Sequence, residues 1–152
     1  MSYFLSQSSK RRLETCHPDL QLVIEEAIKY SPIDFGVSHG HRSPEEQNEL
    51  YQKGRTQPGD IVTYLDGYNK KSKHNESPSH AVDIYCSPSQ IMYDAQHLSA
   101  VVSVILSTAS RLYDEGKITH RLRSGGDWNR NGIFVHKDPA ERFIDMPHIE
   151  II

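Results

Sequence analysis

Hydrophobic residues recur with a helical period in two long stretches of the chain. Leu20, Val23, Ile24, Ala27 and Ile28 follow the i, i+3, i+4 spacing that puts side chains on one face of a helix. Pro18 suits the first helical turn and Ser31-Pro32 ends the pattern, which predicts a helix from 18 to about 29. A longer stripe predicts a second helix, from about 95 to 115, which Gly116 terminates. That stripe comprises Leu98, Val101, Val102, Ile105, Leu106, Ala109, Leu112 and Tyr113.

Shorter segments have the features of a capped helix and of strands. Ser43 can cap a helix that starts at Pro44, with Glu46 reaching back, and this helix should end at 52 or 53 before a left-handed Gly54. Strict alternation predicts a strand over 81–86. Further extended segments are expected at 33–38, near 122 and at 148–152, with a hairpin or extended loop over 61–67. No regular βαβ alternation occurs, so we predict an α+β fold with a small, mainly antiparallel sheet flanked by helices.

Composition narrows the class of protein. With 152 residues, 36% hydrophobic and 24% charged, the chain is expected to form a single domain over 1–152. No apolar run approaches the roughly 20 residues of a membrane span, and residues 1–12 lack the apolar core of a secretory signal. A net charge of −3 without a basic-aromatic motif argues against nucleic-acid binding. Cys16 and Cys86 are isolated and form no disulfide framework or CxxC zinc motif.

Nine histidines and twenty acidic residues suggest a metal site. Polar clusters occur at 72–74, 79–83 and 145–148, and a catalytic zinc needs three protein ligands plus one open position. In the terminal strand, His148 and Glu150 should face away from the apolar Ile149 and Ile151. Asp83 likewise faces away from its apolar neighbours. Each strand therefore presents a potential ligand on its non-core face, where an active-site cleft would lie.

Two histidines compete as partners of Asp83. His74 precedes Asp83 by nine residues, across a loop that contains Pro78 and can reverse the chain. His80 is only three residues away, and it would point to the opposite face from Asp83 if the strand already includes it. The residues alone leave both candidates open. Five other histidines are interpreted as structural or surface residues, namely His39, His41, His97, His120 and His136.

The motifs Ser72-Lys73-His74, Ser79-His80-Ala81-Val82-Asp83 and Asp145-x-x-His148-x-Glu150 resemble those of the LAS metallopeptidases, in the VanY-like and endolysin branch. The likeness extends from about residue 18 to the C-terminus. It includes Gly40-His41-Arg42 with Gln47, Leu50-Tyr51 with Gly54, and Gly126-Asp127-Trp128. Enzymes of this family use zinc to cut peptidoglycan peptides, and they include phage L-alanyl-D-glutamate peptidases. The resemblance implies a hedgehog/D-Ala-D-Ala-peptidase-like fold.

The resemblance also implies roles for individual residues. One zinc ion per chain would be held by His74, Asp83 and His148, although the loop before Asp83 is longer than in many family members. Asp145 would be the general base, and Arg42 would face the oxyanion or a substrate carboxylate. For Arg42 the alternative is a surface salt bridge to the turn at 45–46. Gln47, Ser72 and Trp128 would bind substrate, and Glu150 could orient a ligand.

The expected protein is therefore a zinc-dependent peptidoglycan peptidase of the endolysin type that hydrolyses the L-Ala–D-Glu bond of the stem peptide. Alternatives are a D-Ala-D-Ala carboxypeptidase or dipeptidase on the same scaffold, or a non-catalytic zinc-binding domain. We expect a monomer without a separate cell-wall-binding domain. By this resemblance it would be made in the host cytoplasm, and it would reach periplasmic peptidoglycan after holin-mediated release without inserting into a membrane.

A second cation, with calcium as the expected ion, is suggested near residue 127. Asp127, Asn129, Asn131 and Gly132 follow the D-x-N-x-N-G spacing that opens an EF-hand-like loop. Asp138 occupies the twelfth position in place of the usual glutamate, and no helix-loop-helix frame surrounds the loop. The alternative is an Asx-rich turn that only shapes the site.

Overall fold

Four antiparallel strands form one sheet in the computed structural model, which describes residues 2–135, 137–141 and 143–152. The strands are β1 (Phe35–His39), β2 (Ala81–Cys86), β3 (Leu122–Gly125) and β4 (Asp145–Ile151), in the spatial order β1-β2-β4-β3. The predicted α+β fold with an antiparallel sheet is thus confirmed. His136 lies outside the described residues.

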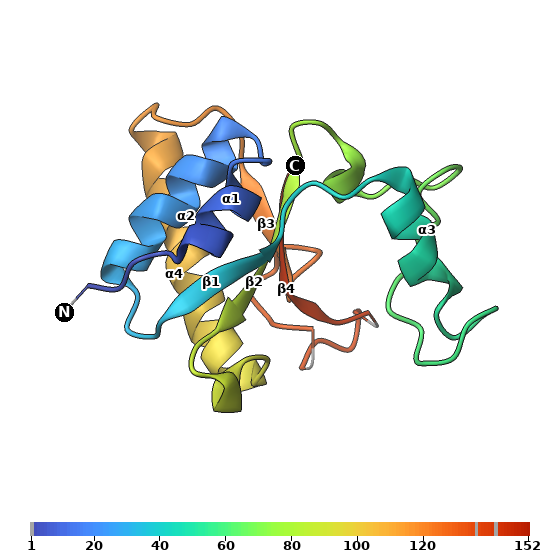
Figure 1. Cartoon of the computed structure of the whole chain (residues 1–152). Helices are drawn as coiled ribbons and strands as arrows, with labels where there is room; N and C mark the ends of the chain where they lie inside the picture. Colours follow the sequence, from blue (N-terminus) through green and yellow to red (C-terminus); the bar gives the residue numbers. More distant parts are fainter. Residues whose placement is uncertain (1, 136, 142) are drawn as a thin grey trace.

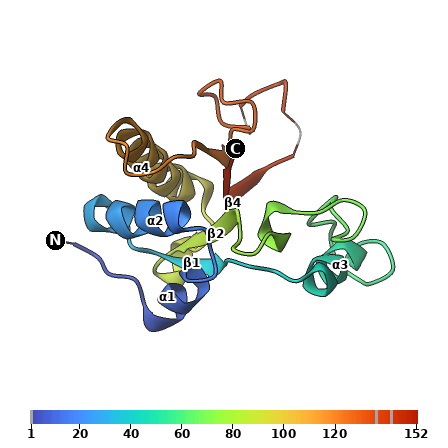
Figure 2. The ribbon, with the colours of Figure 1, turned by 90° about the horizontal axis from the view of Figure 1, so that it is seen from above.

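Two amphipathic helices cover one face of the sheet (Figures 1 and 2). α2 (Pro18–Tyr30) buries all five apolar residues of its predicted stripe, and α4 (Ala95–Asp114) packs against α2 and against β2, β3 and β4. Both helices lie where the hydrophobic spacing predicts them. Gly116 follows α4 with a φ of 72°, a left-handed conformation that glycine adopts without steric penalty. The helices and the inner face of the sheet form the core.

A short N-terminal helix, α1 (Gln7–Leu13), was not predicted, because the sequence analysis places the first element at residue 18. Ser6 caps it by accepting a hydrogen bond from the backbone N–H of Ser9. Only Ser9 and Leu13 of its seven residues are buried, so two inward positions are too few to reveal a period. The helix packs against β1.

The opposite face of the sheet is framed by α3 (Pro44–Gln52) and two loop regions rather than by long helices (Figure 1). The predicted capping box is present: the Ser43 hydroxyl accepts from the N–H of Glu46, and the Glu46 carboxylate accepts from the N–H of Ser43. Residues 61–64 form a loop without strand pairing. Single 3-10 turns, η1 (Lys73–Asn75) and η2 (Ser89–Ile91), flank β2. In the described part of the chain, no helix has the length and apolar character to cross a bilayer.

Strand β4 begins three residues earlier than predicted, at Asp145 instead of His148. Its pairing with β3 is irregular: Ser124 lies opposite Ile149, whereas the next residue, Gly125, lies opposite Asp145. This bulge interrupts the strict alternation of side chains, so residues three apart can turn toward the same side. Gly125 is required at this point, because a Cβ there would come within 2.2 Å of the Asp145 carbonyl oxygen.

Candidate active site

The register of the sheet brings one row of polar side chains together. His39 of β1 lies opposite Asp83 of β2, and Asp83 lies opposite His148 of β4. Cross-strand partners point to the same side of a sheet, and here that side is the one without α2 and α4. Asp83 is therefore flanked by a histidine on each neighbouring strand.

His74 joins this row from η1. Ser72 caps the turn, and its hydroxyl accepts from the backbone N–H of His74. The His74 side chain is 2% exposed; its Nδ1–H donates to the carbonyl oxygen of Gly40 at 2.7 Å. In neutral His74 the lone pair is then on Nε2, which lies 3.2 Å from Oδ1 of Asp83. His74 is thus fixed with a ligand-type nitrogen toward Asp83.

His148 is oriented in the same way by a different partner. Its Nε2–H donates to Oε1 of the buried Glu150 at 2.8 Å, which leaves Nδ1 3.1 Å from Oδ1 of Asp83. Glu150 is held in turn by Arg123, its cross-strand neighbour, whose Nε and Nη2 lie 3.1 and 2.9 Å from Oε2. A carboxylate that fixes the far nitrogen of a histidine is a common support of metal ligands.

The three groups fit a metal ion. Ligand atoms of His74, Asp83 and His148 all lie within 4.8 Å of one another. Their separations of 3.1 and 3.2 Å match the roughly 3.3 Å edge of a tetrahedron with zinc–ligand bonds of about 2.0–2.1 Å. Two imidazole lone pairs that face one carboxylate oxygen need a cation or protons between them. The donor set of two nitrogens and one oxygen suits a divalent metal.

The pKa shifts of Asp83 and His148 also indicate that this site stabilises a positive charge. Burial alone would raise the pKa of Asp83, but the adjacent His74 and His148 hold it well below its usual range. Burial alone would lower the pKa of His148, whereas hydrogen bonds to Asp83 and Glu150 raise it to about 10. The pocket therefore stabilises a carboxylate together with a positively charged centre beside it.

Asp145 lies at the edge of this cluster. Its Oδ2 is 3.9 Å from Nδ1 of His148, and its side chain is 37% exposed, in contrast to the 8% of His148. Burial, and then the negative charge of Asp83, raise the pKa of Asp145 to about 6. A carboxyl group with that pKa can both accept and release a proton near neutral pH.

Arg42 is placed beside Asp83 by a chain of hydrogen bonds. It is 9% exposed; its Nη1 donates to Oε1 of Gln47 at 2.8 Å, and its Nη2 lies 3.4 Å from Oδ2 of Asp83. Gln47, buried on α3, donates in turn to the Thr63 hydroxyl and the Leu65 carbonyl. Among the described residues, Arg42 pairs with these groups and not with the turn at 45–46.

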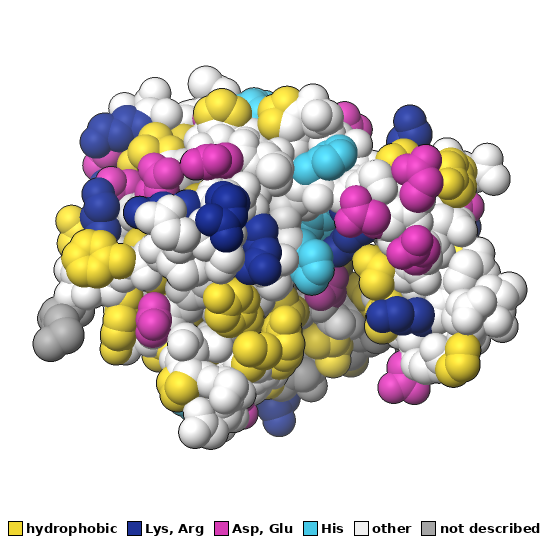
Figure 3. Space-filling view, in the orientation of Figure 1, with side chains coloured by type: hydrophobic (Ala, Val, Ile, Leu, Met, Phe, Trp, Pro, Cys, Tyr) yellow, Lys and Arg dark blue, Asp and Glu magenta, His cyan; other side chains and the backbone are white. Residues whose placement is uncertain are grey.

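These side chains line a cleft of about 730 Å³ between the sheet and the region of α3. Figure 3 shows histidine side chains in the hollow at this junction, next to basic and acidic ones. Trp128 forms part of the wall: its Nε1–H donates to the Phe143 carbonyl, and its ring lies 5.5 Å from that of His148. All nine sequence-predicted residues of the cleft line it, namely Arg42, Gln47, Ser72, His74, Asp83, Trp128, Asp145, His148 and Glu150.

Several residues of the cleft were not predicted from the sequence. His39, taken as structural or surface, lines it with Nδ1 3.8 Å from Oδ2 of Asp83. The pairing register of β1 and β2 places His39 opposite Asp83, but this register could not be read from the sequence. Tyr64 and Phe143 contact each other edge to face with ring centroids 5.5 Å apart, and both line the cleft. Lys71 and Lys73 add positive charge to its wall.

His80, the competing ligand candidate, lies elsewhere. It directly precedes β2, and its ring packs edge to face against His17, with centroids 5.7 Å apart. It is not among the residues that line the cleft. The geometry favours His74, as the strand argument suggested.

The residues of the predicted calcium loop converge on Asp138. The side-chain amides of Asn129 and Asn131 donate to Oδ2 of Asp138 at 3.1 and 2.7 Å, respectively. Asp127 accepts from the backbone N–H groups of Asn131 and Gly132. These bonds form a closed Asx-rich turn, and they also bring four oxygen-bearing side chains into one place.

The cleft combines two imidazoles and a carboxylate that can bind a metal with a second, partly exposed carboxylate beside them. This combination is typical of metal-dependent hydrolases. The sequence profile of one peptidase family, described as phage L-alanyl-D-glutamate peptidase, matches residues 1–152. The chain belongs to this family, a group of peptidases named for a bond of peptidoglycan, which confirms the resemblance drawn from the motifs.

Individual relatives agree. The chain is 31% identical over 126 residues to the peptidoglycan L-alanyl-D-glutamate endopeptidase CwlK of Bacillus subtilis, a match that covers 79% of this chain and 62% of CwlK. It is 25% identical to the L-alanyl-D-glutamate peptidase of Escherichia phage T5 over the full length of both. The crystal structure of the Serratia marcescens L-Ala D-Glu endopeptidase ChiX superposes with a TM-score of 0.67 over 98% of this chain and 90% of ChiX, at 23% identity. The ChiX likeness shows the fold.

Proposed function

We propose that this chain is a zinc-dependent peptidoglycan endopeptidase that hydrolyses the amide bond between L-Ala and D-Glu of the stem peptide. The observation that carries the proposal is the convergence of His74 and His148 on one oxygen of Asp83, with the far nitrogen of each ring already committed as a donor. The family and the names of its relatives support the choice of bond.

His74, Asp83 and His148 would hold the metal, and the mixed nitrogen and oxygen donors favour zinc. When bound, zinc supplies Lewis-acid chemistry: it lowers the pKa of water and polarises the carbonyl group to be cleaved. Glu150 and Arg123 keep the His148 ring in its ligand orientation. The buried Gly40 carbonyl contact does the same for His74.

Asp145 would act as general base. Its position next to His148 and its raised pKa let it take a proton from the attacking water and pass it to the leaving amine of D-Glu. Arg42, fixed by Gln47, would face the developing oxyanion or a substrate carboxylate with its planar fork. Gln47, Ser72 and Trp128 would shape the binding surface for the stem peptide.

A test compares two histidine variants. His74→Ala should lose the tightly bound zinc ion and all lytic activity, because it removes one of three ligands. His80→Ala should keep both, since His80 lies beside His17 outside the cleft. Zinc is measured by elemental analysis after dialysis, and lysis by the turbidity of outer-membrane-permeabilised cells. Retention of tight zinc by His74→Ala, with its loss in His80→Ala, would overturn the ligand assignment.

A second cation site is also proposed at Asp127, Asn129 and Asn131, with Asp138 as a further oxygen donor and calcium as the ion. The convergence of these side chains supports it, because rotation of the two amides would present oxygens in place of nitrogens. Calorimetric titration of zinc-loaded protein with calcium should give a heat of binding that Asp138→Asn reduces. Absence of heat at millimolar calcium would leave only an Asx-rich turn.

We further propose that the catalytic unit spans residues 1–152 as one domain and works as a monomer. It would act on periplasmic peptidoglycan after release through a holin-formed lesion, and the match to a phage peptidase family is consistent with this proposal. The size-exclusion volume of the purified chain tests the monomer.

A further inference from the structure

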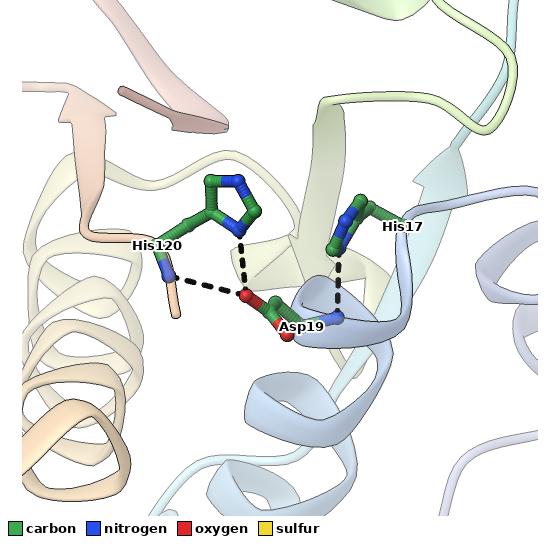
Figure 4. Close-up of side chains that lie close together, drawn as sticks. All are labelled: His17, Asp19 and His120. Atoms are coloured by element: carbon green, nitrogen blue, oxygen red, sulfur yellow. Dashed lines mark hydrogen bonds and ion pairs between the residues drawn. The ribbon is translucent and has the colours of Figure 1, made fainter. Parts of the chain in front are cut away.

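A second cluster of ligand-type side chains lies outside the cleft. His17 directly precedes α2, Asp19 is in the first turn of that helix, and His120 lies shortly before β3 (Figure 4). Ligand atoms of the three residues lie within 4.8 Å of one another, and none of the three lines the cleft. In the described part of the chain, only the cleft cluster meets the same criterion. The fold thus joins residues about 100 positions apart into this arrangement.

Asp19 is held in place before any ion binds. Its Oδ2 accepts hydrogen bonds from the backbone N–H groups of Thr119 and His120 and from Nδ1 of His120, at 3.0, 3.2 and 2.8 Å. All described hydrogen bonds of this carboxylate reach Oδ2, which leaves Oδ1 open. Burial alone would raise the pKa of Asp19, but these hydrogen bonds lower it, so the group carries a negative charge at neutral pH.

The two imidazoles offer lone pairs beside that charge. Nδ1 of His120 lies 2.8 Å from Oδ2 of Asp19, so an ion that takes the place of the proton between them would have one ligand from each residue. The His17 ring lies edge to face with that of His120, with centroids 4.9 Å apart, and its Nδ1 accepts a single bond from the N–H of Asp19 at 3.0 Å.

We propose that His17, Asp19 and His120 form a second binding site, for a divalent transition-metal ion of the zinc class. Imidazole and carboxylate ligands suit such ions, and all three side chains are half-buried, so an ion can enter from solvent. Binding is weaker than in the cleft, because the ion must replace both the bond by which His17 caps α2 and the hydrogen bond between His120 and Asp19. The bound ion ties the start of α2 to the segment before β3 and stabilises the folded chain by linkage.

The test uses a substitution of His17 that keeps the N-terminal cap of α2 but removes the imidazole ligand. Asparagine is a favoured capping residue, so His17→Asn should preserve the start of α2 while it removes an imidazole. His120→Gln is the second variant, since it leaves both backbone hydrogen bonds to Asp19 in place. His97→Ala is the control, because His97 pairs with Asp94 at 2.5 Å on the exposed start of α4, and among the described residues this pair is not part of a three-ligand cluster. Each protein is titrated with zinc from nanomolar to high micromolar free concentration.

Wild type and His97→Ala should bind a tight and a weak zinc ion, and the weak step should raise the melting temperature. His17→Asn and His120→Gln should bind only the tight ion. In the presence of chelator, the melting temperature of His17→Asn should equal that of the wild type. His74→Ala should lose only the tight step, which separates this site from the cleft. A single step in wild type, or two steps in a folded His17→Asn protein, would overturn the proposal.

Discussion

Hydrogen bonds decide which atom of each side chain in the cleft is available for chemistry. His74 and His148 each donate through one ring nitrogen, to Gly40 and to Glu150, and thereby present the other nitrogen to Asp83. Arg42 is fixed through Gln47. The side chains proposed to hold the metal and to face the substrate are therefore oriented by neighbouring groups, and substitutions of either kind should be informative.

Replacement of Asp145 by asparagine should leave the fold and the tight metal intact and lower kcat by about a hundredfold or more, the usual scale for loss of a general base. Asp145 has a pKa of about 6, so in the wild type kcat/KM should fall as the pH drops toward and below that value and the carboxylate becomes protonated. A bound dication favours the carboxylate and can only move this limb to lower pH. An acid limb above pH 7, or normal turnover by metal-loaded Asp145→Asn protein, would contradict the assignment.

Arg42→Lys should lower kcat by roughly tenfold or more, because a point charge cannot reach Gln47 and Asp83 at once as the guanidinium does. The melting temperature should change little. Arg55→Lys is the matched control, since Arg55 lies in the outer loop over Tyr51 and outside the cleft. Equal activity of both variants would make Arg42 a structural residue.

Glu150→Gln should weaken metal binding by about 10–100-fold, the usual effect of losing a group that supports a ligand. The neutral amide no longer holds the His148 ring as strongly, and it removes the ion pair with Arg123. Competition with a zinc chelator measures the affinity. Glu76→Gln, which removes another carboxylate of the cleft wall, should bind zinc as the wild type does; equal affinities in the two variants would exclude the supporting role.

Among the elements, α3 carries Gln47 of the cleft, and its start is fixed by a capping box that is visible in the sequence. Its capping box positions Gln47, and Gln47 anchors both Arg42 and the loop at 63–65. Ser43→Ala should therefore destabilise the protein by about 1 kcal/mol and lower activity at elevated temperature first. Urea unfolding measures the change, with Ser99→Ala on α4 as the control for a serine within a helix. An unchanged unfolding midpoint would show that the cap contributes nothing.

The elements that the sequence predicts well are those with strong local signals. The stripes of α2 and α4, the capping box of α3 and the alternation of β2 depend on neighbours within a few residues. The start of β4 depends instead on its bulged pairing with β3, and α1 on its contact with β1. Register and bulges are set between distant segments, so the approach of Asp145 to His148 and the place of His39 could not be derived from spacing.

At the scale of the whole molecule, the hydrophobic core and the candidate active site lie on opposite faces of the sheet. α2 and α4 bury the apolar stripes against one face, and the other face carries a cleft rich in charged groups (Figures 1 and 2). Motifs spread along the sequence become one site because β2 and β4 pair directly. The ligand motifs could be predicted from the sequence by resemblance, whereas the second histidine cluster could not, since it joins segments about 100 residues apart.

We propose that the chain cuts between L-Ala and D-Glu with a metal held at His74, Asp83 and His148. The most direct test is the digestion of purified sacculi with and without a zinc chelator, followed by mass spectrometry of the products. We expect glycan fragments that end in L-Ala and peptides that begin with free D-Glu, and we expect chelator or the His148→Ala substitution to abolish both. Release of D-alanine with the L-Ala–D-Glu bond intact, or undiminished cleavage in chelator, would contradict it.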